Sequence, residues 1–349
     1  MIRRVSRQVS VGDVKIGGNA PVAIQSMLNA PANDFEGNLC QIKALETAGC
    51  EIVRMAVPDS DAVRVLGKLK EHSNIPLVAD IHFDYRLALE SLEAGVDKIR
   101  INPGNIGSAE RVAAVADACA LKKVPIRIGV NSGSVEKDLL EKFGGATPEA
   151  MVESAFRHVK LLEDCGFYDT VISIKSSDVG NMVEAYSLVA ERCDYPLHLG
   201  VTEAGTERSS LIKSSVGIGS LLLKGIGDTV RVSITDEPVK EIYAAKDILK
   251  AVNVRVETPQ IVSCPTCGRT KIDLVSLANE VEEAVKNIKK PIKIAVMGCV
   301  VNGPGEAKEA DVGIAGGDGC AVLFKKGEIL RKINEKDIVR ELLDEIEKI

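Results

Sequence analysis

Short runs of β-branched residues alternate with longer amphipathic stretches over most of the chain. In the longer stretches apolar residues recur at helical spacing, as at Leu39, Ile42, Leu45 and Ala48. Each short run ends in polar or glycine residues before the next helical stretch begins. The pattern predicts eight β/α units, with strands at 22–27, 52–57, 77–83, 98–102, 125–131, 170–176, 197–202 and 229–235.

Eight consecutive β/α units form either a closed barrel or a wide open parallel sheet. No predicted strand opens into the Gly-x-Gly-x-x-Gly turn of a dinucleotide-binding open sheet. Chemically useful residues also follow nearly all of the strands, and barrel active sites are built at those ends. We therefore expect a TIM-type (β/α)8 barrel over residues 1–250.

The repeat stops near residue 250, and a different pattern begins. Residues 254–259 have the composition of a linker, and an amphipathic helix is predicted at 273–288. A charged helix is predicted from Asp337 to the end of the chain. Strands are predicted at 292–297, 311–315 and 321–324. Residues 251–349 should therefore form a small α+β domain, which makes the whole an α/β protein of two domains.

Composition and charge narrow the kinds of partner. Only 3% of the residues are aromatic and the net charge is −6, which argues against nucleic acid and anionic membranes as partners. The first residues contain no apolar run of a signal peptide, and no stretch approaches the ~18 apolar residues of a membrane span. We expect a cytoplasmic protein whose nine cysteines are reduced thiols.

Cations occur at the ends of five of the predicted strands. They are Arg54, Arg100, Arg127, Lys175 and Arg231. Because the carboxyl ends of barrel strands meet at one face, these side chains should share one mouth. Guanidinium groups pair bidentately with phosphate oxygens, and a diphosphate needs several such partners. The pattern therefore predicts a polyanionic substrate.

Other polar residues follow the same strands. They are Asp80, His82, Asn102, Asn131, Glu203 and Ser233. Taken alone, His82 is typical of a hydrogen-bonded structural residue. Glu203 fits a catalytic or orienting role and a salt bridge to one of the arginines equally well.

Four of the nine cysteines lie near the C-terminus. Cys264 and Cys267 form a Cys-x-x-Cys pair and Cys299 follows a predicted strand, which is the spacing of metal ligands. A thioredoxin-like redox pair would not need Cys299, and structural zinc would need a second pair or histidines that this segment lacks. The spacing favours an iron–sulfur cluster. Cys320 and Glu306 both stay open as its fourth ligand.

Several of these motifs together resemble one enzyme family. They are Cys-Pro-Thr-Cys-Gly-Arg at 264–269, Met-Gly-Cys-Val-Val-Asn-Gly-Pro-Gly-Glu-Ala at 297–307, and the barrel segments 53–58, 79–83 and 100–105. On these residues the chain is similar to the bacterial 4-hydroxy-3-methylbut-2-enyl diphosphate synthases of the non-mevalonate isoprenoid pathway. The similarity extends over essentially the whole chain, without the extra domain that plant-type members insert.

The resemblance implies a reductive enzyme. Its members open 2-C-methyl-D-erythritol 2,4-cyclodiphosphate to an allylic diphosphate with two electrons from reduced flavodoxin or ferredoxin, and release water. It implies a 4Fe–4S cluster held by Cys264, Cys267, Cys299 and Glu306, with Cys320 in a structural role. It also implies a homodimer in which the cluster domain of one subunit caps the barrel mouth of the other.

The resemblance assigns roles to the residues of the mouth as well. The diphosphate would be held by Arg54, Arg100, Arg127, Lys175 and Ser233. Asn131, His82 and Glu203 would lie near the reacting carbons, with Glu203 as a candidate proton donor to the departing hydroxide. The strand-end pattern adds Asn102 and Arg231 to the substrate-binding set.

Two other functions are compatible with parts of the sequence. The first is an electron-transfer or cluster-carrier protein, for which five cations at strand ends would have no use. The second is a barrel phosphate lyase or aldolase in which Lys175 forms a Schiff base. That function gives the three cysteines no role beyond stability.

Overall fold

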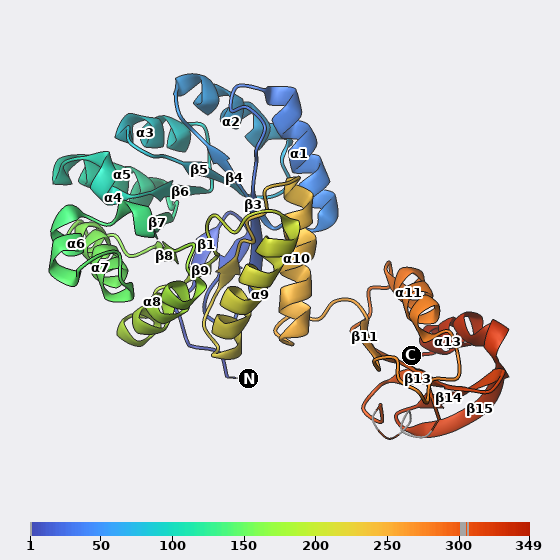
Figure 1. Ribbon diagram of the computed structural model, residues 1–349. Coiled ribbons are helices and arrows are strands. Elements are labelled where there is room, and N and C mark those ends of the chain that lie inside the picture. Colours follow the sequence, from blue (N-terminus) through green and yellow to red (C-terminus); the bar gives the residue numbers. More distant parts are fainter. Residues whose placement is uncertain (1, 301–304, 306) are drawn as a thin grey trace. The chain divides into compact units, whose positions relative to one another are not determined.

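The structure, a computed structural model, describes residues 2–300, 305 and 307–349. The chain divides into two compact units, Met1–Arg255 and Val256–Ile349, each with a hydrophobic core of its own (Figure 1). Every helix in the described part of the chain is too short or too polar to cross a membrane.

Eight parallel strands form the main sheet of the first unit, in the order β8-β7-β6-β5-β4-β3-β10-β9. A further parallel bridge between Ile172 and Leu197 brings the two ends of this sheet together. The predicted (β/α)8 barrel is therefore confirmed. The strands are β3 (Ala23–Met27), β4 (Ile52–Ala56), β5 (Leu77–Asp80), β6 (Lys98–Ile101), β7 (Ile126–Asn131), β8 (Thr170–Lys175), β9 (His198–Leu199) and β10 (Thr229–Val230).

The last two barrel strands are shorter than the sequence pattern predicts. Beyond Leu199 and Val230 the backbone leaves regular pairing, although Arg231 N still donates to Leu199 O at 2.9 Å. A Cβ atom on Gly200 would lie 2.6 Å from Arg231 O. The backbones at Gly200 and Arg231 therefore approach too closely for any residue larger than glycine. The β-branched runs therefore continue the direction of the strands without forming ladders.

A helix follows each barrel strand. The eight helices are α1 (Phe35–Ala48), α2 (Ser60–His72), α3 (Tyr85–Glu93), α5 (Ala109–Lys122), α7 (Pro148–Glu163), α8 (Val179–Arg192), α9 (Glu207–Leu223) and α10 (Pro238–Ala251). Four of them begin at an aspartate whose carboxylate accepts a bond from a backbone N–H of the first turn, at Asp34, Asp59, Asp84 and Asp178. The loops also contain α4 (Pro103–Ile106), a 3₁₀ turn at Ser132–Ser134 and α6 (Lys137–Phe143).

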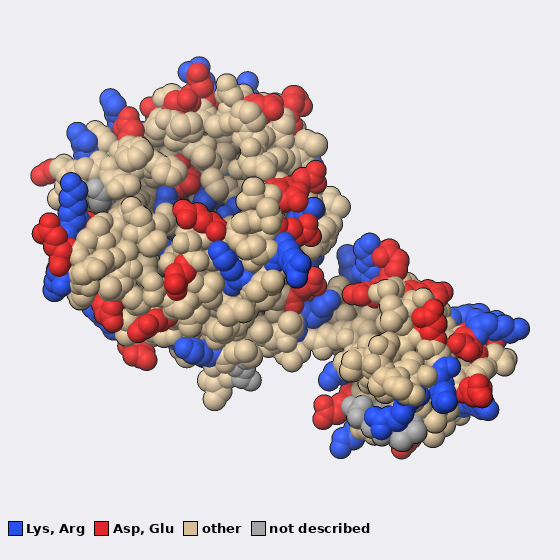
Figure 2. Space-filling view, in the orientation of Figure 1, with Lys and Arg blue, Asp and Glu red and all other residues tan. Residues whose placement is uncertain are grey.

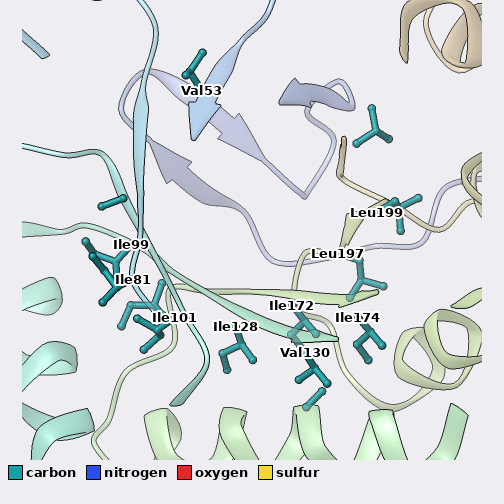
Figure 3. Packing of buried hydrophobic residues seen from close by; sticks show 14 of the residues in the cluster. Val53, Ile81, Ile99, Ile101, Ile128, Val130, Ile172, Ile174, Leu197 and Leu199 are labelled. Carbon is teal, nitrogen blue, oxygen red and sulfur yellow. The ribbon is translucent and has the colours of Figure 1, made fainter. Parts of the chain in front are cut away.

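Alternate residues of the barrel strands face opposite sides. Ile99 and Ile101 of β6 belong to the large apolar cluster that the barrel shares with the helices, as do isoleucines of β7 and β8 (Figure 3). Lys98 and Arg100 alternate with them and therefore point towards the barrel axis. Most such barrels fill their interior with branched apolar side chains, whereas this interior is rich in polar and charged ones.

An N-terminal hairpin that the sequence pattern did not predict covers the other end of the barrel. Its strands are β1 (Val9–Val11) and β2 (Val14–Ile16). Val11 and Ile16 pack on residues near the starts of β3, β4 and β5, namely Ala23, Ile52 and Val78. Because these strands have three residues each, they carry too little periodicity to be recognised.

The second unit is a five-stranded mixed sheet with helices. The strand order is β11-β12-β13-β14-β15, with the first three strands parallel and the last two antiparallel. Its elements are β11 (Gln260–Ser263), α11 (Leu274–Val285), β12 (Lys293–Met297), β13 (Val312–Gly317), β14 (Cys320–Lys325), β15 (Glu328–Asn334), a 3₁₀ turn (Glu335–Asp337) and α13 (Ile338–Glu347). The predicted α+β character is present. Strand β15 was not predicted, because its apolar residues Ile329, Leu330 and Ile333 do not alternate regularly with polar ones.

Candidate active site

Charged side chains from neighbouring strands meet at the carboxyl end of the barrel. They come from β4 (Arg54), β5 (Asp80), β6 (Arg100), β7 (Arg127), the end of β8 (Lys175) and the segment after β10 (Arg231). Lys and Arg atoms are visible deep between the surrounding surfaces at the centre of the barrel unit (Figure 2). The structure thus brings together the five cations that the sequence predicted to share one mouth.

Asp80 holds two of these cations. One of its oxygens lies 3.1 Å from Arg100 Nη1, and the other lies 3.6 Å from Arg54 Nε. Arg100 Nη2 also donates to the carbonyl of Gly129 at 3.2 Å. Burial by itself would raise the pKa of Asp80, but the charges of Arg54 and Arg100 outweigh it and hold the value at about 2. One carboxylate therefore stays ionised between two guanidinium groups.

Glu241, a buried residue of α10, neutralises Arg231. Its carboxylate accepts from Arg231 Nη2 at 2.8 Å and from Arg231 Nε at 3.1 Å, and it also accepts from Ser26 Oγ at 2.7 Å. The remaining Arg231 nitrogen, Nη1, donates to the hydroxyl of Ser233. The charge of Arg231 is thus already balanced, and its main local effect is to orient Ser233.

Arg127 and Lys175 have no such compensation. They are 1% and 6% exposed, and neither forms an ion pair with a carboxylate of the described residues. Burial, together with the charges of the neighbouring arginines, lowers the pKa of both groups well below their ordinary values. Apart from the exposed Glu203 loop, the described part of the mouth therefore has five cations against two carboxylates, Asp80 and Glu241.

Two glycines make room for these long side chains. A Cβ on Gly129 would lie 2.5 Å from Arg100 Nε, and a Cβ on Gly200 would lie 3.2 Å from Lys175 Nζ. Neither glycine has a positive φ, so the requirement is for space. These two glycines and Glu241 were not among the predicted site residues, because their part in the site depends on which side chains pass over them.

The remaining predicted residues are arranged less tightly. Asn131 is paired with Lys175 in the β7–β8 register, and Asn102 is buried directly after β6. His82 and Glu203 are exposed in the loops after β5 and β9, and Glu203 has a φ of 52°, a backbone region that side-chain-bearing residues rarely adopt. The structure places both at the mouth end of the barrel, and neither side chain forms a hydrogen bond or ion pair with the described residues.

In the second unit, the sheet brings two cysteines to one edge. Cys264 directly follows β11, and Cys299 follows Gly298 at the end of β12, which is the parallel neighbour of β11. Gly298 N donates to Cys264 Sγ at 3.3 Å. The Cys-x-x-Cys loop folds back on the same place, because Lys271 N donates to Gly298 O at 3.0 Å. Cys264, Cys267 and Cys299 therefore share one edge of the sheet.

This donor set fits an iron–sulfur cluster. Backbone N–H bonds to cysteine sulfur are a usual means of tuning such clusters, and hydrogen bonds from Arg269 lower the pKa of the exposed Cys267 thiol. No three His, Cys, Asp or Glu side chains of the described residues are grouped to hold a single metal ion. The ligands of a four-iron cluster bind different irons, so they need not converge on one atom.

Of the two candidates for the fourth ligand, the structure describes only Cys320. Glu306 lies outside the described residues. Cys320 begins β14 opposite Gly317, the last residue of β13, and is half-buried. Since β13 runs parallel to β12, Cys320 is at the same edge of the sheet as the other cysteines, one strand further along.

Comparison with known proteins covers both units. Residues 6–246 match the GcpE TIM-barrel domain, and residues 260–348 match the GcpE protein C-terminal domain. The chain is 57% identical over 348 residues to the 4-hydroxy-3-methylbut-2-en-1-yl diphosphate synthase (flavodoxin) of Caldanaerobacter subterraneus subsp. tengcongensis, covering 100% of this chain and 98% of that protein. It is 57% identical over 349 residues to the protein of the same name from Clostridium perfringens, covering 100% of both.

One solved structure illustrates the likeness of the barrel fold. The structure of a truncated 3-deoxy-D-arabino-heptulosonate 7-phosphate synthase from Thermotoga maritima superposes on this chain with a TM-score of 0.53 and 13% sequence identity. The superposition covers 72% of this chain and 95% of the synthase chain. At that identity the likeness shows the fold and nothing of the chemistry. The full-length relatives carry the name that the motifs predicted. The chain therefore belongs to the GcpE family and contains both of that family's domains.

Proposed function

We propose that this chain opens 2-C-methyl-D-erythritol 2,4-cyclodiphosphate reductively to 4-hydroxy-3-methylbut-2-en-1-yl diphosphate. The reaction takes up two electrons and two protons, breaks a ring C–O bond and releases one water. The relatives at 57% identity bear the name of this enzyme and of flavodoxin. The structural observation that carries the proposal is the surplus of buried positive charge at the mouth, which a cyclic diphosphate would balance.

The mouth residues would divide the work of binding. Arg54 and Arg100 present guanidinium groups that Asp80 already orients, and Ser233 presents a hydroxyl that Arg231 orients. Arg127 and Lys175 contribute the uncompensated charge. When the ring C–O bond breaks, the departing phosphate oxygen gains negative charge, and preorganised cations stabilise it without having to move. Asn102 and Asn131 would complete the substrate-binding set.

The loops would supply the proton for the departing water. Glu203 and His82 lie at the mouth end and are exposed, so a bound substrate can reach them. A carboxyl group that an anionic substrate encloses from water holds its proton and can pass it to the departing hydroxide. We assign the proton donor to Glu203 and place His82 beside the reacting carbons.

The second unit would supply the electrons. Cys264, Cys267, Cys299 and Glu306 would hold a 4Fe–4S cluster, which would supply one-electron transfer from flavodoxin or ferredoxin and a Lewis-acidic iron. The common edge of the three cysteines supports this assignment. We further propose a homodimer in which the cluster unit of one subunit covers the mouth of its partner and excludes water.

The direct test is anaerobic purification followed by absorbance and EPR spectroscopy and an assay with the cyclic diphosphate and reduced flavodoxin. A brown protein that forms the allylic diphosphate, identified by mass spectrometry, is expected. A colourless protein with stoichiometric zinc would overturn the proposal. So would an iron–sulfur protein that leaves the cyclic diphosphate unchanged.

Lys175→Met should lower kcat/KM by about a hundredfold, because it removes an uncompensated cation that faces the substrate phosphates. The midpoint of thermal unfolding should not fall, since burying an unpaired lysine costs free energy that methionine does not. Steady-state kinetics and calorimetry check the two expectations. Lys68→Met, an exposed position on α2, is the control and should change neither. A Lys175→Met protein with full activity would contradict the assignment.

Gly129→Ala should raise KM for the cyclic diphosphate by about tenfold, because the new methyl group displaces the Arg100 guanidinium from its place beside Asp80. Gly219→Ala on α9 is the control, since its Cβ would meet Val252 at an ordinary 3.7 Å. An unchanged KM in Gly129→Ala would mean that Arg100 does not contact the substrate.

A further inference from the structure

A second layer of polar side chains lies inside the barrel below the mouth cations. Lys98 of β6 and His198 of β9 are 0% exposed, and Gln25 of β3 is 1% exposed. Lys98 Nζ, His198 Nε2 and both amide atoms of Gln25 have no hydrogen-bond partner among the described residues. Such buried, unsatisfied groups are costly, so their retention in this interior requires a reason.

Lys98 occupies a particular place in this layer. It lies two residues before Arg100 on the inward face of β6, which puts its Cα about 7 Å deeper in the barrel. In the β5–β6 register it is opposite Val78, against which the covering hairpin packs, whereas Arg100 is opposite Asp80. Lys98 is therefore enclosed from below and faces the mouth from beneath.

Within the described part of the chain, the groups around Lys98 supply no free counter-charge. The charged and titratable residues facing the barrel axis are Arg54 of β4, Asp80 of β5, Arg100 of β6, Arg127 of β7, Lys175 of β8, His198 of β9 and Arg231 after β10. Asp80 is engaged with two arginines, and Glu241, which reaches the mouth from α10, is engaged with Arg231.

The surroundings of Lys98 therefore disfavour a charge on its amine. Burial, followed by the charges of Arg127 and Arg54, lowers the pKa of Lys98 well below its ordinary value. A dianion bound at the mouth favours the charged form of the Lys98 amine. It adds negative charge above the amine, which the barrel encloses on its other sides. The binding of substrate and the protonation of Lys98 should then strengthen each other.

We propose that Lys98 is a positioning residue for the diphosphate, neutral in the free protein and protonated from solvent when the cyclic diphosphate enters the mouth. The inference rests on the proposed function, because it takes the cyclic diphosphate as the ligand. The charged ammonium group attracts the phosphates from below but adds to the repulsion among Arg54, Arg100 and Arg127. Only the bound substrate offsets that repulsion, so the ammonium group forms only together with the ligand. The role is one of charge, without contact between Lys98 and the substrate.

Lys98→Met tests this role, because methionine keeps the length of the side chain and removes the amine. Without ligand, the variant should unfold at a temperature about 2–4 °C higher than the unsubstituted protein, since an unsatisfied polar group has been replaced by an apolar one. Its affinity for the cyclic diphosphate, measured anaerobically on the holoprotein without reductant, should fall about ten- to a hundredfold. A merely structural lysine would give the reverse, lower stability and unchanged affinity.

The number of protons taken up is the decisive measurement. Isothermal titration calorimetry at pH 8 in buffers of different ionisation enthalpy should show about one proton more taken up by the unsubstituted protein than by Lys98→Met. Lys98→Arg, which is always charged, should bind the substrate without that proton and unfold at a lower temperature than the unsubstituted protein. Lys68→Met serves as the surface control.

The outcomes separate this inference from the proposed function. If the unsubstituted protein does not bind the cyclic diphosphate, the proposed function fails. If it binds, and Lys98→Met binds equally well with the same proton uptake, the role of Lys98 is wrong while the proposed function stands.

Discussion

Cys299→Ala is expected to leave the protein without its visible absorbance and EPR signal and without reductive turnover. Cys299 and Cys264 stand at the ends of neighbouring parallel strands, and the Cys-x-x-Cys loop is bonded back to Gly298. Removing one of three thiolates at this edge leaves too few ligands to hold four irons. The barrel core is separate from the core of the second unit, so far-UV circular dichroism should change little.

Two other cysteines provide the comparison. Cys40→Ala, at an exposed position of α1, should retain the cluster and full activity. Cys320→Ala decides the fourth ligand, because Cys320 lies at the same edge as the other three. If Cys320→Ala keeps the cluster and Glu306→Ala loses it or its turnover, the carboxylate assignment holds. If Cys299→Ala remains brown and active, the cluster is elsewhere and the assignment of the second unit fails.

Much of the barrel could be predicted from the sequence because its signals are local. The alternation of β-branched runs with amphipathic stretches gave the order of strands and helices, and the fold then placed Arg54, Arg100 and Arg127 at a common end. The Cys-x-x-Cys spacing is local as well. The number of strands and the end at which the site lies follow from these patterns without any knowledge of contacts.

The electrostatic balance of the mouth could not be predicted, since it depends on contacts between distant elements. Glu241 belongs to α10, where a glutamate reads as an exposed helical residue, yet it is 2% exposed and pairs with Arg231. Lys98 reads as an ordinary strand residue until the pleat places it inside the barrel. Five cations can be assigned to strand ends from the sequence. Which of them pair with a buried carboxylate can be seen only in the structure.

Asp80→Asn is expected to lower the free energy of unfolding by about 3–5 kcal/mol, because it leaves the largely enclosed guanidinium groups of Arg54 and Arg100 without their shared counter-charge. Chemical denaturation of the holoprotein measures the change. Asp84→Asn is the matched control: Asp84 lies four residues further on and pairs with Arg86 at the surface, and asparagine can still cap α3. The control should lose less than about 1 kcal/mol.

The effect of Asp80 also has a defined dependence on pH. Its pKa in the folded protein is about 2, below the ordinary value of 3.8, so its stabilising contribution is complete above pH 3.8 and is lost as the pH falls towards 2. The difference in stability between the unsubstituted protein and Asp80→Asn should therefore be constant near neutral pH and shrink in acid. A difference that persisted unchanged at pH 2 would show that the substitution acts through packing.

Anions give a second way to separate charge from packing. With Asp80 neutral, the mouth has five cations against Glu241 alone, so inorganic phosphate should raise the unfolding temperature of Asp80→Asn more than that of the unsubstituted protein. Affinity for the cyclic diphosphate should nevertheless fall, because Arg54 and Arg100 have lost the group that orients them. Stabilisation by phosphate together with weaker substrate binding would show that Asp80 positions the cations as well as compensating them. If phosphate stabilised both proteins equally, the carboxylate would be a structural counter-ion with no part in forming the site.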